Sequence, residues 1–265
     1  MVIVSATNDH YAQHLAVMLT SLLKHQQTDR PIHIYILYSD LSAISIAKLQ
    51  RAIAQFRASV VFLHVDAQRF EDFAPGSGGQ KYISKEAYYR MIIPDLLDEE
   101  VAKALYLDCD IIVRADLTEL WDTDIDEYDL AAVDESRVLT KSDRDIRMNR
   151  LSLPLDSYYF NSGVLLINVK RWREKHISSE LMEFVKSRGG RLALMDQDAL
   201  NAVLYNRWLR LEDKWNFTTA HSSKHSAKKA AILHFTGPDK PWNSKSPFTK
   251  EYRKYLKQSS WEKPI

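Results

Sequence analysis

The stretch A-L-Y-L-D-C-D-I-I-V, residues 104–113, places two carboxylates inside what otherwise reads as a buried β-strand. Aspartate is rare in strands, and burying an unpaired carboxylate costs free energy. In an extended backbone, residues i and i+2 point to the same side. Asp108 and Asp110 therefore converge on one region, while Cys109 points the other way into packing.

Two chemical remedies fit this pair of aspartates. A divalent cation is a hard ion that prefers oxygen ligands, and ligands of open α/β sheets sit at the carboxyl ends of strands. Alternatively, each aspartate caps a turn or pairs with an arginine or a lysine. The D-x-D motif does not decide between these remedies, because it also arises by chance.

The segments that precede this stretch alternate between strand and helix patterns. Val2–Ala6, Ile32–Tyr38 and Val60–Val65 are apolar and rich in β-branched or aromatic residues. Between them, Tyr11–His25 carries apolar residues at helical spacing, and Ser42 fits the N-cap of a second amphipathic helix. This β-α-β-α-β order predicts a parallel sheet wrapped by helices.

The later segments continue the α/β pattern with irregular additions. A Gly-rich turn is expected at 75–79, and a helix over Ser84–Ile93 that Pro94 stops. Further elements are expected as a short helix around Asp116–Trp121, strands at Leu130–Val133, Gly163–Asn168 and Ala231–Phe235, and helices at Ser179–Lys186 and Asp196–Tyr205. We predict one α/β domain over residues 1–243, with residues 244–265 as its basic and aromatic helical extension.

The composition excludes several classes of protein. The 265 residues are 45% hydrophobic with a formal net charge of +1, and a nucleic-acid binder needs a clearer basic excess. A single cysteine excludes an intramolecular disulfide and a cysteine-built zinc site. We see neither a secretory signal nor an apolar run long enough to span a membrane, and expect a soluble, cytoplasmic protein.

A phosphate-bearing substrate is the first expectation for a cation held by few carboxylates, because such an ion takes its other ligands from phosphate and water. His234 ends a predicted strand and leads into T-G-P-D-K-P-W, residues 236–242. It can complete the metal shell, or it can be a structural histidine. An imidazole among oxygen ligands favours Mn²⁺ over Mg²⁺ or Ca²⁺.

Four segments in order resemble the retaining nucleotide-sugar glycosyltransferases of family 8, the glycogenin-related group with bacterial α-galactosyl- and α-glucosyltransferases. They are S-A-T-N-D-H-Y (5–11), A-Y-Y-R (87–90) with L-Y-L-D-C-D (105–110), Y-F-N-S-G-V-L-L-I-N (159–168) with K-R-W-R, and D-Q-D (196–198) with H-F-T-G-P-D-K-P-W (234–242). The resemblance implies a single-domain GT-A fold with a Rossmann-like, mostly parallel central sheet. It covers about residues 2–243.

The resemblance also implies the site residues. Asp108, Asp110 and His234 would hold Mn²⁺, with Mg²⁺ as a substitute, across the diphosphate of a UDP-sugar. The remaining donor-site residues it implies are Ala6, Asn8 and Tyr11 at the uridine, Arg90 and Asp134 at the sugar hydroxyls or phosphates, Asn161 at the sugar, Cys109 in the D-C-D segment, and Gly237 and Lys240 at the diphosphate. Asp196 and Gln197 would lie beside the anomeric carbon. Asn8 and His10 depart from the usual Asp and Asn of the family.

Retention of configuration is likewise implied by the family. An amide such as that of Gln197 is a poor nucleophile, which favours front-face transfer, with the leaving UDP phosphate taking the proton of the acceptor. We expect UDP-galactose or UDP-glucose as donor and a cell-surface glycan, glycolipid or glycoprotein as acceptor. The mixed basic and aromatic C-terminus suits either an anionic membrane surface or a solvated last helix. The alternatives are a metal-dependent phosphohydrolase and a non-catalytic UDP-sugar-binding protein.

Overall fold

A seven-stranded main sheet organises the computed structural model, which describes residues 1–73, 84–136, 138–189, 192–218, 227–243 and 246–262. Its strand order is β3-β2-β1-β4-β7-β6-β8. The strands are β1 (Val2–Ala6), β2 (Ile32–Tyr38), β3 (Ala58–His64), β4 (Lys103–Leu107), β6 (Leu130–Val133), β7 (Val164–Asn168) and β8 (Trp208–Leu211). Only β7 runs antiparallel to its neighbours in this sheet, which confirms the predicted α/β class with a mostly parallel sheet.

A second, three-stranded sheet has the order β5-β10-β9 and consists of β5 (Ile111–Val113), β10 (Ile232–His234) and β9 (Phe217–Thr218). The prediction of one continuous strand over residues 104–113 is therefore wrong. The Asp108 N–H still donates to the Gly163 carbonyl beside β7, whereas the Asp110 carbonyl accepts from Phe235 N–H beside β10. The D-C-D segment is the crossing between two sheets, and its carboxylates lie where both sheets end.

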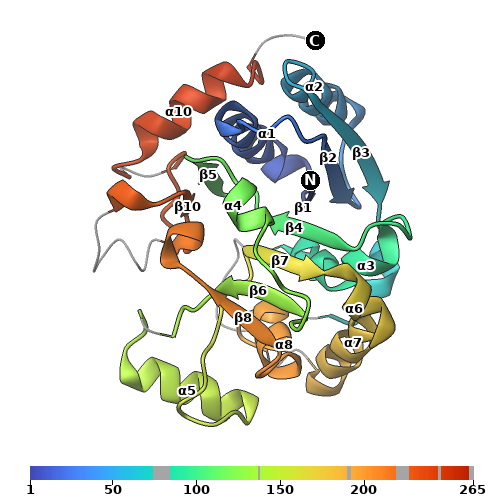
Figure 1. Cartoon of the computed structure of the whole chain (residues 1–265), viewed down its shortest axis with the longest axis vertical. Coiled ribbons are helices and arrows are strands. Elements are labelled where there is room, and N and C mark those ends of the chain that lie inside the picture. The colour runs from blue at the N-terminus through green and yellow to red at the C-terminus, as the bar shows by residue number, and fades with distance from the viewer. Residues whose placement is uncertain (74–83, 137, 190–191, 219–226, 244–245, 263–265) are drawn as a thin grey trace.

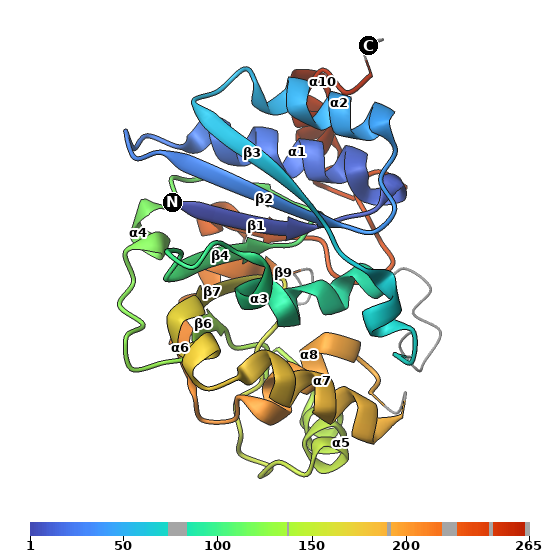
Figure 2. The ribbon, with the colours of Figure 1, turned by 90° about the vertical axis from the view of Figure 1, so that its right-hand side faces the viewer.

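Helices cover both faces of the main sheet (Figure 1; Figure 2). Within the described ranges, the α-helices are α1 (Asp9–His25), α2 (Ala43–Ile53), α3 (Ile93–Leu96), α4 (Thr118–Trp121), α5 (Lys141–Leu151), α6 (Val169–Glu174), α7 (Ile177–Arg188), α8 (Met195–Val203) and α10 (Thr249–Gln258). The 3₁₀ helices there are η1 (Ala67–Phe70), η2 (Lys85–Ile92), η3 (Asp213–Asn216) and η4 (Ala227–Lys229). Ser42 caps α2 as predicted, its side chain accepting from Ser45 N–H.

Alternating side chains of the central strands enter two separate cores. Ile3 and Leu105 pack with the apolar faces of α1 and α2, whereas Val4 and Tyr106 pack with residues of η2, α7 and α8. Each fully buried aliphatic side chain contributes about 1.5–3 kcal/mol relative to an exposed one. Burial on both faces explains why these strands are apolar throughout rather than alternating.

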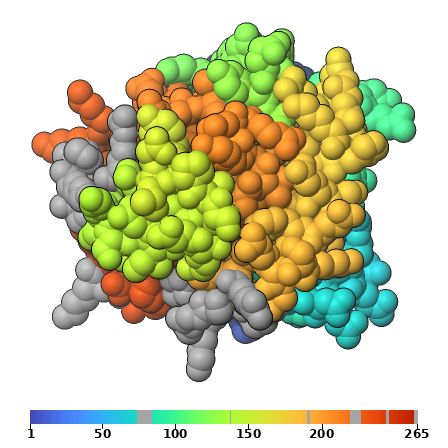
Figure 3. All heavy atoms as spheres, turned by 90° about the horizontal axis from the view of Figure 1, so that it is seen from below, coloured from blue at the N-terminus to red at the C-terminus, as the bar shows by residue number. Residues whose placement is uncertain are grey.

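Several expected boundaries differ from the structure. The segment Ser84–Ile93 is a 3₁₀ helix over most of its length, and Pro94 lies in the first turn of α3 instead of ending a helix. Proline is tolerated there because a first-turn N–H has no partner within the helix. Several elements were not predicted, among them α5, α6, β8 and β9. Helix α5 lies on the surface of the protein, beside the orange segment that includes β8 (Figure 3). The Gly-rich turn at 75–79 lies outside the described residues.

The C-terminal helix α10 packs along α1 (Figure 1). Its aromatic residues Tyr252 and Tyr255 are buried, whereas Arg253, Lys254 and Lys257 are exposed. The aromatic side chains of α10 therefore belong to the core, and its basic side chains form the outer face of the helix. Among the described residues, no helix has both the length and the apolar composition needed to cross a membrane.

Candidate active site

A cavity lies at the carboxyl ends of β1 and β4, where the main sheet meets the small one. It is lined by nearly all residues that the sequence analysis assigned to the site: Ala6, Asn8, Tyr11, Arg90, Asp108, Cys109, Asp110, Asn161, Asp196, Gln197, His234, Gly237 and Lys240. Because parallel strands end at the same edge of a sheet, residues far apart in the sequence meet there.

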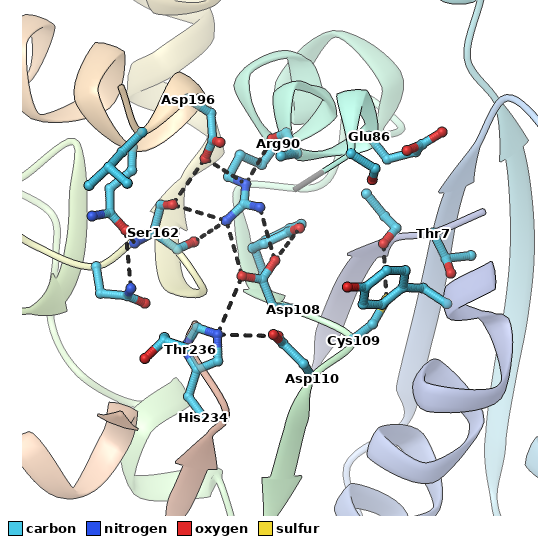
Figure 4. Close-up of a pocket in the computed structure, with 18 of the residues that line it drawn as sticks. Thr7, Glu86, Arg90, Asp108, Cys109, Asp110, Ser162, Asp196, His234 and Thr236 are labelled. Atoms are coloured by element: carbon cyan, nitrogen blue, oxygen red, sulfur yellow. Dashed lines mark hydrogen bonds and ion pairs between the residues drawn. The ribbon is translucent and has the colours of Figure 1, made fainter. Parts of the chain in front are cut away.

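Three potential metal ligands converge in this cavity. One ligand atom from each of Asp108, Asp110 and His234 lies within 4.8 Å of the others. His234 Nε2 lies 3.2 Å from Asp110 Oδ1 and 3.7 Å from Asp108 Oδ2 (Figure 4). On the other side of the ring, His234 Nδ1 lies 2.9 Å from Asn216 Oδ1, which leaves Nε2 directed at the carboxylates. Two carboxylates and an oriented imidazole suit a divalent cation.

Both aspartates also form ion pairs with basic side chains, which is the alternative to metal binding that the sequence left open. Arg90 Nη2 lies 2.9 Å from Asp108 Oδ1, and Lys240 Nζ lies 2.5 Å from Asp110 Oδ2. Burial disfavours the charged form of Asp110, but Lys240 and His234 outweigh it and hold the pKa of Asp110 well below its usual range. The mutual repulsion of the D-x-D carboxylates is therefore offset by cations of the protein itself.

Arg90 joins this acidic pair to the predicted sugar-binding side of the cavity. Its side chain is buried, and its Nε lies 3.1 Å from Asp196 Oδ2 while its Nη1 donates to the Ser162 carbonyl at 2.6 Å. Burial raises the pKa of Asp196 to about 6, although Arg90 lowers it in part. Arg90 thus holds the half-buried carboxylate of Asp108 and the buried carboxylate of Asp196 on either side of one guanidinium (Figure 4).

Removing this guanidinium is expected to destabilise the fold. Arg90→Met leaves two largely buried carboxylates without their cation, and breaking a buried pair costs about 3–5 kcal/mol. The folded-state pKa of Asp196 lies above its ordinary value, so this group takes up a proton as the pH falls through about 6. The loss should therefore be larger at pH 8 than at pH 5, as measured by urea unfolding.

The exposed ion pair between Arg30 and Asp122 provides the control. Arg30→Met is expected to leave the free energy of unfolding nearly unchanged at both pH values, because exposed pairs contribute little. Equal losses in the two variants, or an Arg90→Met loss that is the same at pH 5 and pH 8, would contradict this explanation.

Asn8 and Tyr11, which the sequence analysis expects at the uridine, line one end of the cavity. The Asn8 side-chain carbonyl accepts from Tyr11 N–H at 3.1 Å and caps α1, and its Nδ2 donates to Glu86 Oε2 at 3.1 Å. The Tyr11 ring meets Trp242 edge-on, with 6.3 Å between centroids. Cys109 is buried as expected, and its Sγ contacts the Ala6 carbonyl at 3.1 Å. Burial raises the pKa of its thiol.

The loop after β10 carries Gly237 and Lys240. Gly237 adopts a positive φ of 84°, a backbone conformation that favours glycine. Trp242 stacks on His14 with 3.6 Å between ring centroids, and His14 Nδ1 lies 2.7 Å from the Tyr252 hydroxyl. His14, to which the sequence analysis gave no role, thus contacts both this loop and α10.

Asp134 is the predicted site residue that is not among the described residues lining the cavity. Its Oδ1 accepts from the backbone N–H groups of Ser136 and Tyr159, at 2.9 and 3.3 Å. The neighbouring Glu135 lines the cavity instead, and Glu135 Oε2 accepts from Gln197 Nε2 at 3.2 Å. Glu135 and Asn216 were missed because neither lies in a motif, and only their contacts in the fold indicate a role.

Comparisons with known proteins agree with this geometry. The family model described as glycosyl transferase family 8 matches residues 2–246. The chain is 34% identical to general stress protein A of Bacillus subtilis, over 98% of this chain and 94% of that protein. It is 33% identical to a lipopolysaccharide 1,3-galactosyltransferase of Salmonella typhimurium, over 72% of this chain and 58% of that protein.

The crystal structure of the galactosyltransferase LgtC in complex with donor and acceptor sugar analogs is also similar. It matches with a TM-score of 0.85 and 26% identity, over 100% of this chain and 97% of that one. The fold is thus the GT-A fold of glycosyltransferases. The chain belongs to glycosyl transferase family 8.

Proposed function

We propose that this protein is a retaining hexosyltransferase that moves galactose or glucose from a UDP-sugar to a hydroxyl of a cell-surface glycan, glycolipid or glycoprotein. The observation that carries the proposal is the meeting of Asp108, Asp110 and His234 with Gln197 and Lys240 in one cavity. A donor diphosphate and its sugar need cationic and hydrogen-bonding groups side by side, and this cavity has both.

The leaving diphosphate would be stabilised at the Asp108–Asp110–His234 end of the cavity. These residues would hold Mn²⁺, with Mg²⁺ as a substitute, and the bound cation would neutralise charge that develops on UDP. Lys240 lies beside Asp110 and would contact the diphosphate together with the backbone of Gly237. An ammonium positioned at the leaving group stabilises the transition state more than the ground state.

Other cavity residues would bind and orient the donor. We assign Ala6, Asn8 and Tyr11 to the uridine, with Tyr11 stacking on the base, and place Cys109 in the same donor site. Arg90 would reach the sugar or the phosphates, and Asn161 the sugar. Asp134 does not line the cavity, and its Oδ1 already accepts two backbone N–H groups. It would contact the sugar where the bound donor extends beyond the residues that line the cavity.

The reacting carbon would lie beside Asp196 and Gln197. Asp196 is held by Arg90 and by the Ser162 hydroxyl at 3.0 Å, and would bind sugar hydroxyls. Gln197 is an amide, and so would stabilise positive charge on the sugar without forming a covalent bond. Front-face transfer follows: the departing phosphate of UDP accepts the proton of the acceptor hydroxyl as the new glycosidic bond forms.

The names of relatives support the substrate class. One similar protein is a lipopolysaccharide 1,3-galactosyltransferase, and the LgtC structure contains donor and acceptor sugar analogs. A cytoplasmic enzyme with the exposed lysines of α10 at the inner membrane surface would meet lipid-linked acceptors there. Vesicle sedimentation with and without anionic lipid measures this contact.

Gln197→Ala tests the mechanism. We expect it to retain measurable transfer, with kcat reduced by about 10²–10³-fold, the usual effect of losing one charge-stabilising group. Release of UDP and formation of the glycosidic product are the measurements. If Gln197→Ala is inactive and Gln197→Glu accumulates a covalent glycosyl adduct by mass spectrometry, double displacement replaces front-face transfer.

A further inference from the structure

Three side-chain amides form a hydrogen-bonded chain from the metal-binding histidine to a carboxylate across the cavity. His234 Nδ1 lies 2.9 Å from Asn216 Oδ1, and Asn216 Nδ2 donates to Asn161 Oδ1 at 2.8 Å. Asn161 Nδ2 donates to Gln197 Oε1 at 3.1 Å. Gln197 Nε2 then donates to Glu135 Oε2 at 3.2 Å. These residues come from distant parts of the fold: His234 ends β10 of the small sheet, Asn161 precedes β7, Gln197 lies in α8, and Glu135 follows β6.

Backbone N–H groups determine which atom of each amide is the oxygen, and therefore which side chain donates to the next along the chain. Ser162 N–H donates to Gln197 Oε1 at 3.1 Å, and Gly163 N–H donates to Asn161 Oδ1 at 3.0 Å. A backbone N–H can only donate, so both oxygens are identified. With Oε1 of Gln197 so identified, its NH₂ group is the one that faces Glu135 Oε2 at the far end of the chain. Both amides therefore have one orientation.

The orientation of Asn161 also determines which atom of Asn216 faces His234. Since Asn161 Oδ1 accepts from Asn216 Nδ2, the Asn216 carbonyl remains for His234. A carbonyl can only accept, so Nδ1 of His234 donates to Asn216 Oδ1, and Nε2 is the ring nitrogen that is left for a cation. Nε2 faces the carboxylates of Asp108 and Asp110, an arrangement that a bound cation stabilises.

We propose that Glu135 and Asn216 are positioning residues at the two ends of this chain. Glu135 orients Gln197 beside the reacting sugar, and Asn216 holds His234 in the Nδ1–H tautomer that leaves Nε2 for the metal. Both are largely buried. The inference about Glu135 rests on the proposed transfer reaction, whereas that about Asn216 depends only on cation binding.

The metal end is tested by calorimetric titration of Mn²⁺ in the presence of UDP. Asn216→Ala removes the acceptor for His234 and should weaken Mn²⁺ binding about 10–100-fold, the usual loss for a group that orients a metal ligand. Asn216→Asp keeps an acceptor for Nδ1 but loses the N–H that donates to Asn161, and should recover only part of this affinity. Wild-type affinity in Asn216→Ala, or equal losses in both variants, would overturn the role of Asn216.

The tautomer gives a second readout that does not depend on activity. Two-dimensional ¹⁵N–¹H NMR of the imidazole, with Mg²⁺ and UDP to avoid a paramagnetic ion, should show His234 protonated at Nδ1. In Asn216→Ala the ring should populate both tautomers. Protonation at Nε2 in the wild-type protein would overturn the assigned direction of the chain.

The Glu135 end is tested by steady-state kinetics. Glu135→Ala leaves the Gln197 amide without its carboxylate acceptor and should lower kcat about 10–100-fold, as small displacements of oriented groups do. The KM for the UDP-sugar and the Mn²⁺ affinity should change less than about threefold, since binding contacts remain. Glu135→Gln keeps an oxygen that accepts from Gln197, and should recover most of the lost rate.

Glu183, exposed on α7, provides the control, because Glu183→Ala removes a carboxylate far from the chain of amides. An effect of Glu135→Ala on KM alone, or equal losses in Glu135→Ala and Glu135→Gln, would overturn the role of Glu135. Failure of the wild-type protein to transfer any sugar would instead overturn the proposed function, and the metal-affinity and NMR results would still decide the role of Asn216.

Discussion

Asp110→Ala is expected to abolish sugar transfer, lowering the rate by about 10³-fold or more. Asp110 contacts both other parts of the site: its Oδ1 lies 3.2 Å from His234 Nε2 and its Oδ2 lies 2.5 Å from Lys240 Nζ. Its loss would remove one of the three proposed protein ligands and free the lysine that would meet the diphosphate. Metal ions contribute several kcal/mol of transition-state stabilisation, and each 1.36 kcal/mol is about tenfold in rate.

The measurement is kcat at saturating UDP-sugar and Mn²⁺, with Mn²⁺ affinity determined in parallel. Asp110→Asn keeps the size of the side chain and should lose metal affinity. Because it also removes the charge that pairs with buried Lys240, urea unfolding of the same variant measures the loss of stability separately. Glu127→Ala, an exposed carboxylate after α4, is the matched control and should behave as wild type. Activity of Asp110→Ala within about tenfold of wild type would contradict its assignment as a metal ligand.

Gly163→Ala is expected to disrupt the same site from the backbone side. A Cβ at this position would lie 2.1 Å from His234 Cε1 and 2.7 Å from Asp108 Oδ2, so both side chains must move. Overpacking of this kind costs about 1–3 kcal/mol of stability. Because the displaced side chains are two of the three proposed metal ligands, Mn²⁺ affinity should fall by about 10²-fold as well. Calorimetry and urea unfolding measure the two effects separately.

Gly189 offers a matched control for this substitution. It caps α7 at a positive φ of 50°, and nothing lies within 4 Å of the Cβ that alanine would add. Gly189→Ala should therefore cost about 1 kcal/mol of stability through the backbone alone and leave Mn²⁺ affinity unchanged. Wild-type Mn²⁺ affinity in Gly163→Ala would show that the metal ligands do not need this close approach.

The fold could be predicted where local patterns are strong. Val2–Ala6, Ile32–Tyr38 and the helices between them have clear periods, and they appear in the structure nearly as expected. The helix α5 was missed because K-S-D-R-D-I-R-M-N-R-L has few apolar residues and only Met148 and Leu151 are buried. The D-C-D segment was taken for the inside of one strand, since a sequence does not show that its two halves pair with different sheets.

The candidate site shows the same limit. Asp108 and Asp110 are visible as a local oddity, and the motif segments supplied His234, Lys240 and Gln197. Long-range partners are different: nothing in the sequence joins Arg90 to Asp196 or Asn216 to His234. Asp134 shows how a difference of one position changes the assignment. Strand β6 ends at Val133, and the Asp134 side chain accepts a hydrogen bond from nearby backbone. The next residue, Glu135, lines the cavity in its place.

Release of UDP from a panel of UDP-sugars, with simple galactosides and glucosides as acceptors and with either Mn²⁺ or EDTA, tests the proposed function most directly. We expect turnover of UDP-galactose or UDP-glucose, an α-linked product in which the donor configuration is retained, loss of activity in EDTA and recovery on adding Mn²⁺. Failure of every UDP-sugar to bind or react in the presence of Mn²⁺, or full activity in EDTA, would contradict it.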